Sequence, residues 1–234
     1  MKDHRPPALP LLAREAASFA VMRMLARFGP AVALPQTGAK RLILVIPGFM
    51  AGDETTTRLR RSLENAGHET YGWGLGRNRG VTADLLDRID RRVVSIQAKS
   101  DASGPAVIIG WSLGGLLARE YAKHAPDKVA QVITLGSPFS GDIRGNNAWR
   151  VYELIAGHKV DEPPYETALN EKPIMPTTAF WSRRDGVVSP ASARGETGEA
   201  DEQIELDCTH MAFISKPSVI AAIAGAIANE SSAR

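Results

Sequence analysis

A serine between two glycines gives the chain its clearest capacity for covalent chemistry. Gly110 and Gly114 lie two residues on either side of Ser112 in the stretch GWSLG, directly after the apolar run AVII. A serine in a sharp turn between a strand and a helix needs small residues at both positions, because larger side chains would collide across the turn. Amides at the start of the helix would then face any negative charge that develops beside the serine. The stretch predicts a nucleophilic Ser112, although a glycine-rich turn with an unreactive serine has the same residue pattern.

A serine hydroxyl becomes a nucleophile only when a base removes its proton, so a histidine must reach Ser112 and an acid must orient that histidine. For a serine on such a turn, the acid and then the histidine follow in chain order. His210 comes after the last predicted strand, in the stretch LDCTH, and is our candidate for the base. His158 is the alternative; it lies in a long connection, and we interpret it as a surface residue.

Asp185 is the candidate for the acid. It follows the predicted strand PTTAFWSRR and is itself followed by Gly186, which indicates a tight loop at the carboxyl end of that strand. Asp142 and Asp207 are rivals, the first after the preceding strand and the second three residues before His210. Each of these aspartates could also be a solvated loop residue.

Two backbone amides are expected to stabilise a developing oxyanion. One is the amide of Leu113, directly after the serine, and the other belongs to the loop that follows the apolar run RLILVIPG. Gly48 lets that loop approach a substrate closely, so Phe49 is the predicted second donor and Met50 is the alternative. A plain glycine turn after a strand would have the same sequence.

The elements that must position these residues alternate between buried strands and amphipathic helices. Such alternation predicts the α/β class, with a mostly parallel sheet covered by helices on both faces and ligands at the carboxyl ends of the strands. Thr82 is the expected N-cap of one helix. The predicted strands are 41–48, 68–73, 106–110, 128–138, 176–186 and 202–208, and the predicted helices are 11–28, 55–67, 82–99, 116–125 and one from Pro217.

The length and composition predict one domain with a single core, over residues 37–234, after an N-terminal helical extension at 1–36. The connection 141–176 is too long for an ordinary loop and is predicted to form a small helical lid. The formal charge of +2 gives no basic surface of the kind that nucleic-acid binding requires. A single cysteine, Cys208, excludes an intrachain disulfide framework and favours a cytoplasmic location.

The helix predicted at residues 11–28 ends at Gly29 and Pro30. It is too interrupted by charge to span a bilayer, and we expect the charges to share one side of it. We interpret it as a helix packed on the domain or at a dimer contact, with contact to a membrane surface as the alternative. The oligomeric state is left open. The interrupting residues are Arg14, Glu15, Arg23 and Arg27.

Several large side chains could line a substrate pocket. In the predicted lid, Trp149, Tyr152, Leu154 and Ile155 recur at helical spacing, which is equally the pattern of packing residues. The stretch GWGLGRNRG at 72–80 either borders the pocket or simply turns the chain. The residues that we expect at the substrate are Met50, Trp73, Trp111, Trp149 and Tyr152.

Taken together, PGF after the first strand, GWSLGG, ITLGSPFSGD, SRRDGVV and CTH resemble the α/β-hydrolase superfamily, in particular its lipase-like and esterase-like members. The resemblance covers residues 41 to 229 and implies a catalytic triad of Ser112, Asp185 and His210. Many lipases have a histidine before the oxyanion glycine, where this chain has Pro47.

The activity that the resemblance implies is hydrolysis of a carboxylic ester through an acyl-enzyme, with a small ester or lipid as substrate and with no metal or organic cofactor. Acyl transfer by the same residues and a catalytically silent binding module are the alternatives. The acyl-chain length and the alcohol part of the substrate do not follow from the sequence.

Overall fold

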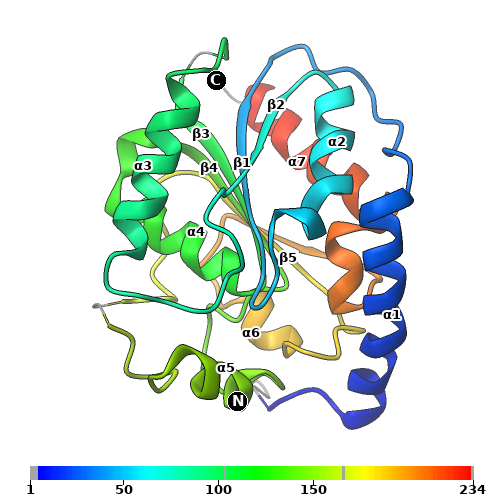
Figure 1. Cartoon of the computed structure of the whole chain (residues 1–234), viewed down its shortest axis with the longest axis vertical. Coiled ribbons are helices and arrows are strands. Elements are labelled where there is room, and N and C mark those ends of the chain that lie inside the picture. Colours follow the sequence, from blue (N-terminus) through cyan, green and yellow to red (C-terminus); the bar gives the residue numbers. More distant parts are fainter. Residues whose placement is uncertain (1–4, 103, 165–166, 233–234) are drawn as a thin grey trace.

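In the part of the chain that the structure describes, six parallel strands form one sheet in the order β2-β1-β3-β4-β5-β6 (Figure 1). The structure is a computed structural model that describes residues 5–102, 104–164 and 167–232. The four inner strands are buried because helices cover both faces of the sheet, and the Val, Ile and Leu residues of β1, β3 and β4 suit that position. The strands are β1 Leu42–Ile46, β2 Glu69–Gly72, β3 Ala106–Trp111, β4 Val129–Leu135, β5 Thr177–Trp181 and β6 Glu202–Glu205.

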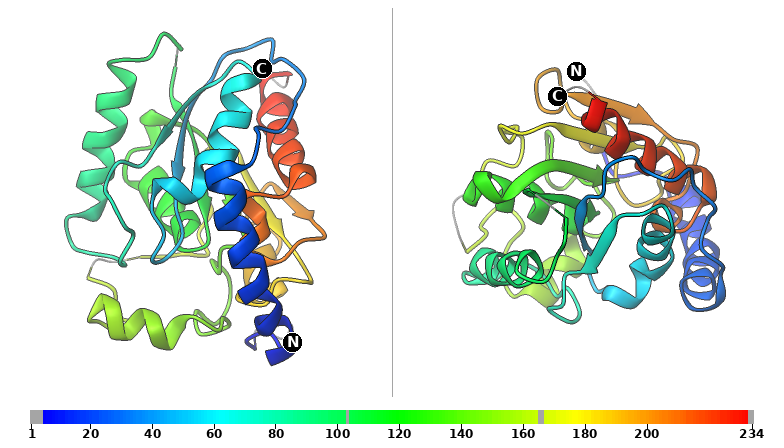
Figure 2. Two further views of the ribbon diagram at one scale, coloured as in Figure 1. Left: turned by 45° about the vertical axis from the view of Figure 1, so that its right-hand side comes forward. Right: turned by 90° about the horizontal axis from the view of Figure 1, so that it is seen from above.

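Helices on the two faces bury two separate apolar clusters against the sheet (Figures 1 and 2). On one face lie α1 Leu9–Phe28, α2 Thr57–Asn65 and α7 Pro217–Ser232; on the other lie α3 Leu85–Gln97 and α4 Leu113–His124. The predicted α/β class with both faces covered is therefore confirmed. The shorter helices are α5 Trp149–Ala156, α6 Pro190–Arg194 and the 3₁₀ helices η1 Asp53–Thr56, η2 Pro126–Lys128 and η3 His210–Ile214.

The strand order reverses beside β1. From β1 the chain adds β2 on one side, then crosses to β3 on the other side and continues outward to β6. Helices that leave neighbouring strands on opposite faces open a crevice at such a reversal, between the carboxyl ends of the two strands. The loop after β1 and the turn after β3 therefore meet at this point, and these are the segments that carry Phe49 and Ser112.

Helix α3 begins later than its sequence pattern predicts. Thr82 was the expected N-cap, but the helix starts at Leu85 and Asp84 is in the capping position. The Thr82 hydroxyl donates to the Asp84 carboxylate at 2.7 Å instead of bonding to a helical amide, which explains why the prediction was wrong.

Helix α1 departs from its predicted charge distribution. Arg14, Arg23 and Arg27 are exposed, whereas Glu15 is only 3% exposed and faces the protein. The expectation that the four charges share one side is wrong, because the Glu15 carboxylate accepts hydrogen bonds from backbone amides beneath the helix. Among the described residues, no helix combines the length and apolar character needed to cross a membrane.

Candidate active site

Ser112 occupies a strained turn between β3 and α4. Its backbone has φ 55° and ψ −120°, a conformation that costs a non-glycine residue about 1–3 kcal/mol and that recurs at functional sites. The flanking glycines leave no room for a side chain. A Cβ on Gly110 would lie 2.2 Å from the carbonyl oxygen of Gly114, and one on Gly114 would lie 2.3 Å from the carbonyl oxygen of Ile46. The two glycines therefore permit the turn that holds the serine at the carboxyl edge of the sheet.

Asp185 and His210 form a buried pair. The Nδ1 atom of His210 lies 2.7 Å from Oδ2 of Asp185, and the two residues are 2% and 1% exposed. The other carboxylate oxygen, Oδ1, accepts hydrogen bonds from the amides of Val187 and Val188, each at 2.8 Å. Both oxygens of Asp185 are therefore engaged, and the carboxylate fixes the orientation of the imidazole with Nδ1 as its donor.

Opposing effects set the pKa of His210. Burial lowers the pKa of the imidazole, but the charge of Asp185, its hydrogen bond to Nδ1 and the charge of Glu15 raise it. The net result is a pKa above the ordinary histidine value, so this imidazole holds its proton more tightly than a free one.

The strand that carries Ser112 also contacts His210. The indole Nε1 of Trp111 donates to the carbonyl oxygen of His210 at 3.1 Å, and the two rings lie 5.6 Å apart. In the described part of the chain, no hydrogen bond joins the Ser112 hydroxyl to the imidazole. Catalytic hydrogen bonds are often long or poorly aligned without substrate and tighten when it binds. Ser112 shares one cavity with Val187 and Val188, the residues that bind Asp185.

The loop after β1 lies against the turn of Ser112. A Cβ on Gly48 would be 3.3 Å from the Cβ of Ser112, so only a glycine allows this approach without displacement. The amide of Met50 already donates to the carbonyl oxygen of Asn78 at 2.7 Å, which removes Met50 as an oxyanion donor. Phe49 and Leu113 both line the cavity beside Ser112, and their role as oxyanion donors stays a prediction.

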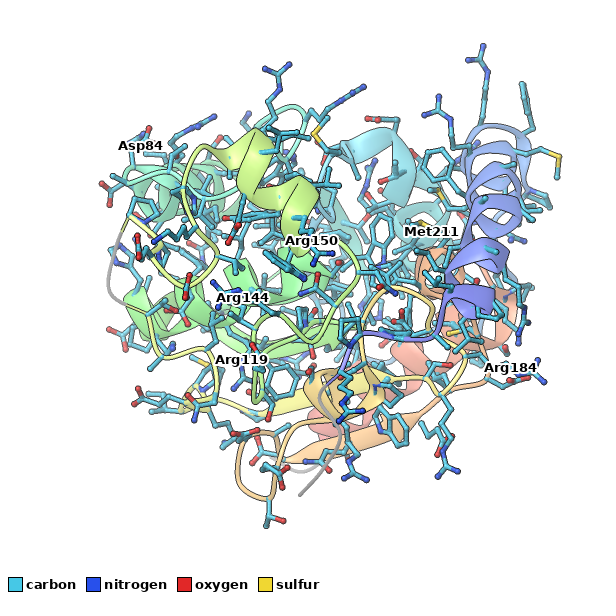
Figure 3. All side chains as sticks on the ribbon, turned by 90° about the horizontal axis from the view of Figure 1, so that it is seen from below. Asp84, Arg119, Arg144, Arg150, Arg184 and Met211 are labelled. Atoms are coloured by element: carbon cyan, nitrogen blue, oxygen red, sulfur yellow. The ribbon has the colours of Figure 1, made fainter. Side chains whose placement is uncertain are left out.

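An apolar cavity extends from Ser112 between α4 and the segment that contains α5. On α4 it is lined by Leu113, Leu116, Leu117 and Glu120, which recur at the spacing of one helix face. Trp149 and Tyr152 of α5 line the opposite side, and the Tyr152 ring lies 5.3 Å from that of Phe49. Arg150 belongs to α5 and Arg144 lies near this helix in Figure 3; their guanidinium carbons are 4.7 and 5.5 Å, respectively, from the Trp149 ring centre.

Not every predicted substrate contact lies at this cavity. Of the predicted contacts, Trp149 and Tyr152 line it, while Trp111 is buried beneath the site against His210. Trp73 is buried among α3 side chains, and its indole donates to the carbonyl oxygen of Gly76, so the 72–80 stretch turns the chain at this point. Outside the cavity lining are Met50, Trp73, Trp111 and the two α5 residues Leu154, 84% exposed, and Ile155, 39% exposed.

The rival candidates for acid and base lie elsewhere. The Asp142 carboxylate accepts from the Arg144 amide at 2.8 Å, and that of Asp207 pairs with exposed Arg184 at 2.8 Å. The His158 ring is not a free surface group: its Nε2 lies 3.3 Å from the Tyr152 hydroxyl. Within the described ranges, no three His, Cys, Asp or Glu side chains cluster closely enough to hold a metal ion.

Two buried polar residues support the site without any sequence pattern that predicts them. Asn78, fully buried, donates from Nδ2 to the carbonyl oxygen of Pro47 at 2.8 Å and fixes the loop of Phe49. Glu15 bonds to the loops of Asp185 and His210. Both act on residues distant in the chain, and only the three-dimensional structure identifies such partners.

Known proteins with similar sequence or structure were compared with the chain. A family model described as the alpha/beta hydrolase fold matches residues 46–160, which include Phe49, Ser112 and Leu113 but neither Asp185 nor His210. No curated protein matches the sequence.

Solved structures of ester-cleaving enzymes share the arrangement of strands and helices. An enzyme from a study of LipS and LipT, two metagenome-derived lipolytic enzymes, has a TM-score of 0.59 at 17% identity, over 86% of this chain and 98% of that chain. The pyrethroid hydrolase PytH has a TM-score of 0.56 at 20% identity, over 83% of this chain and 98% of that chain. A thermophilic esterase from Thermogutta terrifontis has a TM-score of 0.55 at 16% identity, over 83% of this chain and 92% of that chain. At these identities the likeness establishes the fold.

Proposed function

We propose that this chain, which has the α/β-hydrolase fold, is a serine hydrolase that cleaves carboxylic esters through an acyl-enzyme. Ser112 is the nucleophile, His210 the general base and acid, and Asp185 the residue that orients the imidazole. The observation that carries the proposal is the buried Asp185–His210 pair, with its 2.7 Å hydrogen bond, at the sheet edge where Ser112 occupies a strained turn.

In the first half of the reaction, the Nε2 atom of His210 takes the proton of the Ser112 hydroxyl as Oγ attacks the ester carbonyl carbon. The carbonyl oxygen becomes an oxyanion, which the amides of Phe49 and Leu113 stabilise. The C–O bond to the alcohol then breaks, and the imidazolium returns its proton to the departing alkoxide. Asp185 stabilises the imidazolium through Nδ1 and remains ionised throughout.

In the second half, a water molecule gives its proton to Nε2 and attacks the acyl carbon as hydroxide. The tetrahedral intermediate collapses, the bond to Oγ breaks, and the proton on His210 passes to Ser112. The products are a carboxylic acid and the free enzyme. Each step uses only side chains and amides of this chain together with water.

The cavity supports an apolar ester as the substrate. Its lining beside Ser112 is formed mainly by aliphatic and aromatic side chains, so burying a hydrocarbon group there removes apolar surface from water. We assign substrate contact to Phe49, Leu116, Trp149 and Tyr152. The segment 141–176, which carries α5, acts in this proposal as the lid over the cavity.

The test is hydrolysis of p-nitrophenyl esters from acetyl to palmitoyl by the parent, by Ser112→Ala and by Ser100→Ala. Ser100 precedes β3 at the opposite edge of the sheet and is the matched control. Ser112→Ala should lower kcat by about 10⁴- to 10⁶-fold for every ester that the parent cleaves, and Ser100→Ala should retain the parent rate.

A fluorophosphonate probe completes the test, because it should add one label to the parent and none to Ser112→Ala. Hydrolysis by Ser112→Ala near the parent rate would show that the nucleophile is misassigned. A parent that neither cleaves an ester nor takes up the probe would favour the catalytically silent binding module instead.

A further inference from the structure

We infer that Glu15 of α1 is a positioning residue for the acid and the base, whose single buried carboxylate holds the Asp185 loop and the His210 loop together. The inference rests on the proposed function, because it concerns how those two residues are kept in place. Glu15 lies outside the matched region of the family model, and nothing in the reaction requires it to touch the substrate.

The Glu15 carboxylate accepts hydrogen bonds from amides of both loops. Its Oε1 accepts from the amide of Gly186, directly after Asp185, and from the amide of His210 itself, each at 2.8 Å. Its Oε2 accepts from the amide of Met211 at 3.1 Å, and Figure 3 shows Met211 beside α1. One side chain thus joins the residue after the acid to the base, although the two loops lie 171 and 195 positions further along the chain.

Helix α1 is packed closely enough to keep the carboxylate in place. A Cβ on Gly186 would lie 2.4 Å from the carbonyl oxygen of Leu11, so the acid loop runs directly under the helix backbone. Ser18, one turn after Glu15, bonds through its hydroxyl to that of Thr209. The Asn147 side chain donates to the carbonyl oxygens of Pro7 and Gly186. The views in Figures 1 and 2 agree that α1 lies beside the segment with η3.

The acid and base need such support because neither lies within a regular strand or long helix. Asp185 is in a loop four residues after β5, and His210 is the first residue of the short 3₁₀ helix η3. A displacement of about 1 Å at a catalytic group can cost on the order of 10²-fold in rate. The Glu15 carboxylate fixes the distance between the two loops and hence the hydrogen bond within the pair.

Glu15 also contributes charge near the imidazole. The charged groups that face His210 are Asp185, from the loop after β5, and Glu15, from α1. The other neighbours are the rings of Trp111 from β3 and Phe213 from η3. The nearby cations are engaged with Asp207: Arg184 pairs with its carboxylate and Lys216 donates to its carbonyl oxygen. Removing the charge of Glu15 therefore removes one of two anions that favour the imidazolium.

Three substitutions separate the reach of this side chain from its charge. Glu15→Gln keeps one oxygen for the amides of Gly186 and His210 but removes the charge, and its NH₂ group faces the amide of Met211. Glu15→Asp keeps the charge and shortens the side chain. Glu15→Ala removes both. Met22→Ala is the control, since Met22 is a fully buried residue of the same helix that packs in the core.

The measurement is the pH dependence of kcat and of kcat/KM on a p-nitrophenyl ester, together with thermal unfolding. Glu15→Gln should move the acid limb of kcat/KM about one pH unit lower, because one nearby negative charge is lost. Glu15→Asp should keep the parent midpoint, and both Glu15→Asp and Glu15→Ala should lower kcat by on the order of 10²-fold with KM little changed. Met22→Ala should lower Tm and leave the midpoint and kcat unchanged.

The inference is overturned if Glu15→Gln and Glu15→Asp both have the parent's kcat and midpoint, or if Met22→Ala moves these quantities as much as they do. If Glu15→Ala fails to fold, the two conservative variants still decide the matter. Ser112→Ala is measured alongside. If Ser112→Ala is active, the proposed function fails; if it is inactive while the Glu15 variants match the parent, only the role of Glu15 fails.

Discussion

Replacing Asp185 with asparagine tests how the acid acts, because the structure fixes what each atom of the new side chain would meet. Oδ2 accepts from Nδ1 of His210 at 2.7 Å, and Oδ1 accepts from the amides of Val187 and Val188 at 2.8 Å each. An asparagine offers one oxygen and one NH₂ group in the place of two acceptors. If its oxygen stays with the two amides, the NH₂ group faces Nδ1. The imidazole must then carry its proton on Nε2 and cannot accept one from Ser112.

The opposite orientation of the asparagine is unfavourable. It would place the NH₂ group against the amides of Val187 and Val188 and leave two buried donors without an acceptor, at a cost of roughly 1–3 kcal/mol each. The inactive arrangement is therefore preferred by about 2–6 kcal/mol, which corresponds to a factor of about 30 to 10⁴ in the population of the reactive tautomer. The lost stabilisation of the imidazolium adds to this, so we expect Asp185→Asn to lower kcat by about 10³- to 10⁴-fold.

The assay is steady-state hydrolysis of the best p-nitrophenyl ester, with Tm measured on the same samples. Asp207→Asn is the matched control, because Asp207 lies three residues from His210 and pairs with exposed Arg184. KM and Tm of Asp185→Asn should stay close to those of the parent, since the volume and the two amide bonds are kept. A kcat within tenfold of the parent, or an equal loss in Asp207→Asn, would refute the reasoning.

The remaining predictions concern the base, the turn and a control position in α7. The pKa of His210 is raised above the ordinary value of 6.5. We therefore expect kcat/KM to rise with pH as the imidazole loses its proton, with a midpoint above 6.5. A pH profile from a stopped assay with a midpoint below 6.5 would contradict this prediction. The same shift means that the imidazolium stabilises the fold at low pH and that this contribution is lost as pH rises through the folded-state pKa. Gly114→Ala should lower the free energy of unfolding in urea by about 1–3 kcal/mol, because the new Cβ would collide with the backbone at the end of β1. Gly225→Ala in α7 is the control. A Cβ at Gly225 would have no other atom within 4 Å, so this substitution should raise the free energy of unfolding by up to about 1 kcal/mol. Equal stability of the two variants would exclude this packing.

The sequence predicted the fold correctly wherever a local residue pattern is compatible with only one kind of secondary structure. Buried apolar runs separated by amphipathic helices predicted the parallel sheet, and each candidate catalytic residue comes after one of its strands. Ser112, Asp185 and His210 follow β3, β5 and β6, which end at the same edge because the strands are parallel. Periodicity thus sufficed to propose that residues far apart in the chain converge.

Contacts that depend on tertiary packing could not be predicted in this way. Glu15 lies in a helix with three exposed arginines, and its sequence context is that of a solvated charge. Its inward orientation depends on amides that no pattern connects with α1. The same applies to Trp73 and Trp111, whose size suggested contact with substrate but whose indole groups donate to backbone carbonyls, Trp73 within its own turn and Trp111 beneath the site.

The two halves of the proposed active site are supported in different ways. Ser112 follows the central strand β3 directly and Phe49 lies three residues after β1, so the sheet itself constrains the proposed nucleophile and the proposed oxyanion donor. Asp185 and His210 lie on loops after β5 and β6, towards one edge of the sheet, and β6 is mostly exposed. Fewer strands constrain these loops, and the Glu15 carboxylate supplies the missing contacts from outside the sheet. Substitutions of Glu15 should therefore affect proton transfer by His210 more than they affect the position of Ser112, which is why the pH profile and kcat, rather than probe labelling of the serine, are the sensitive measurements.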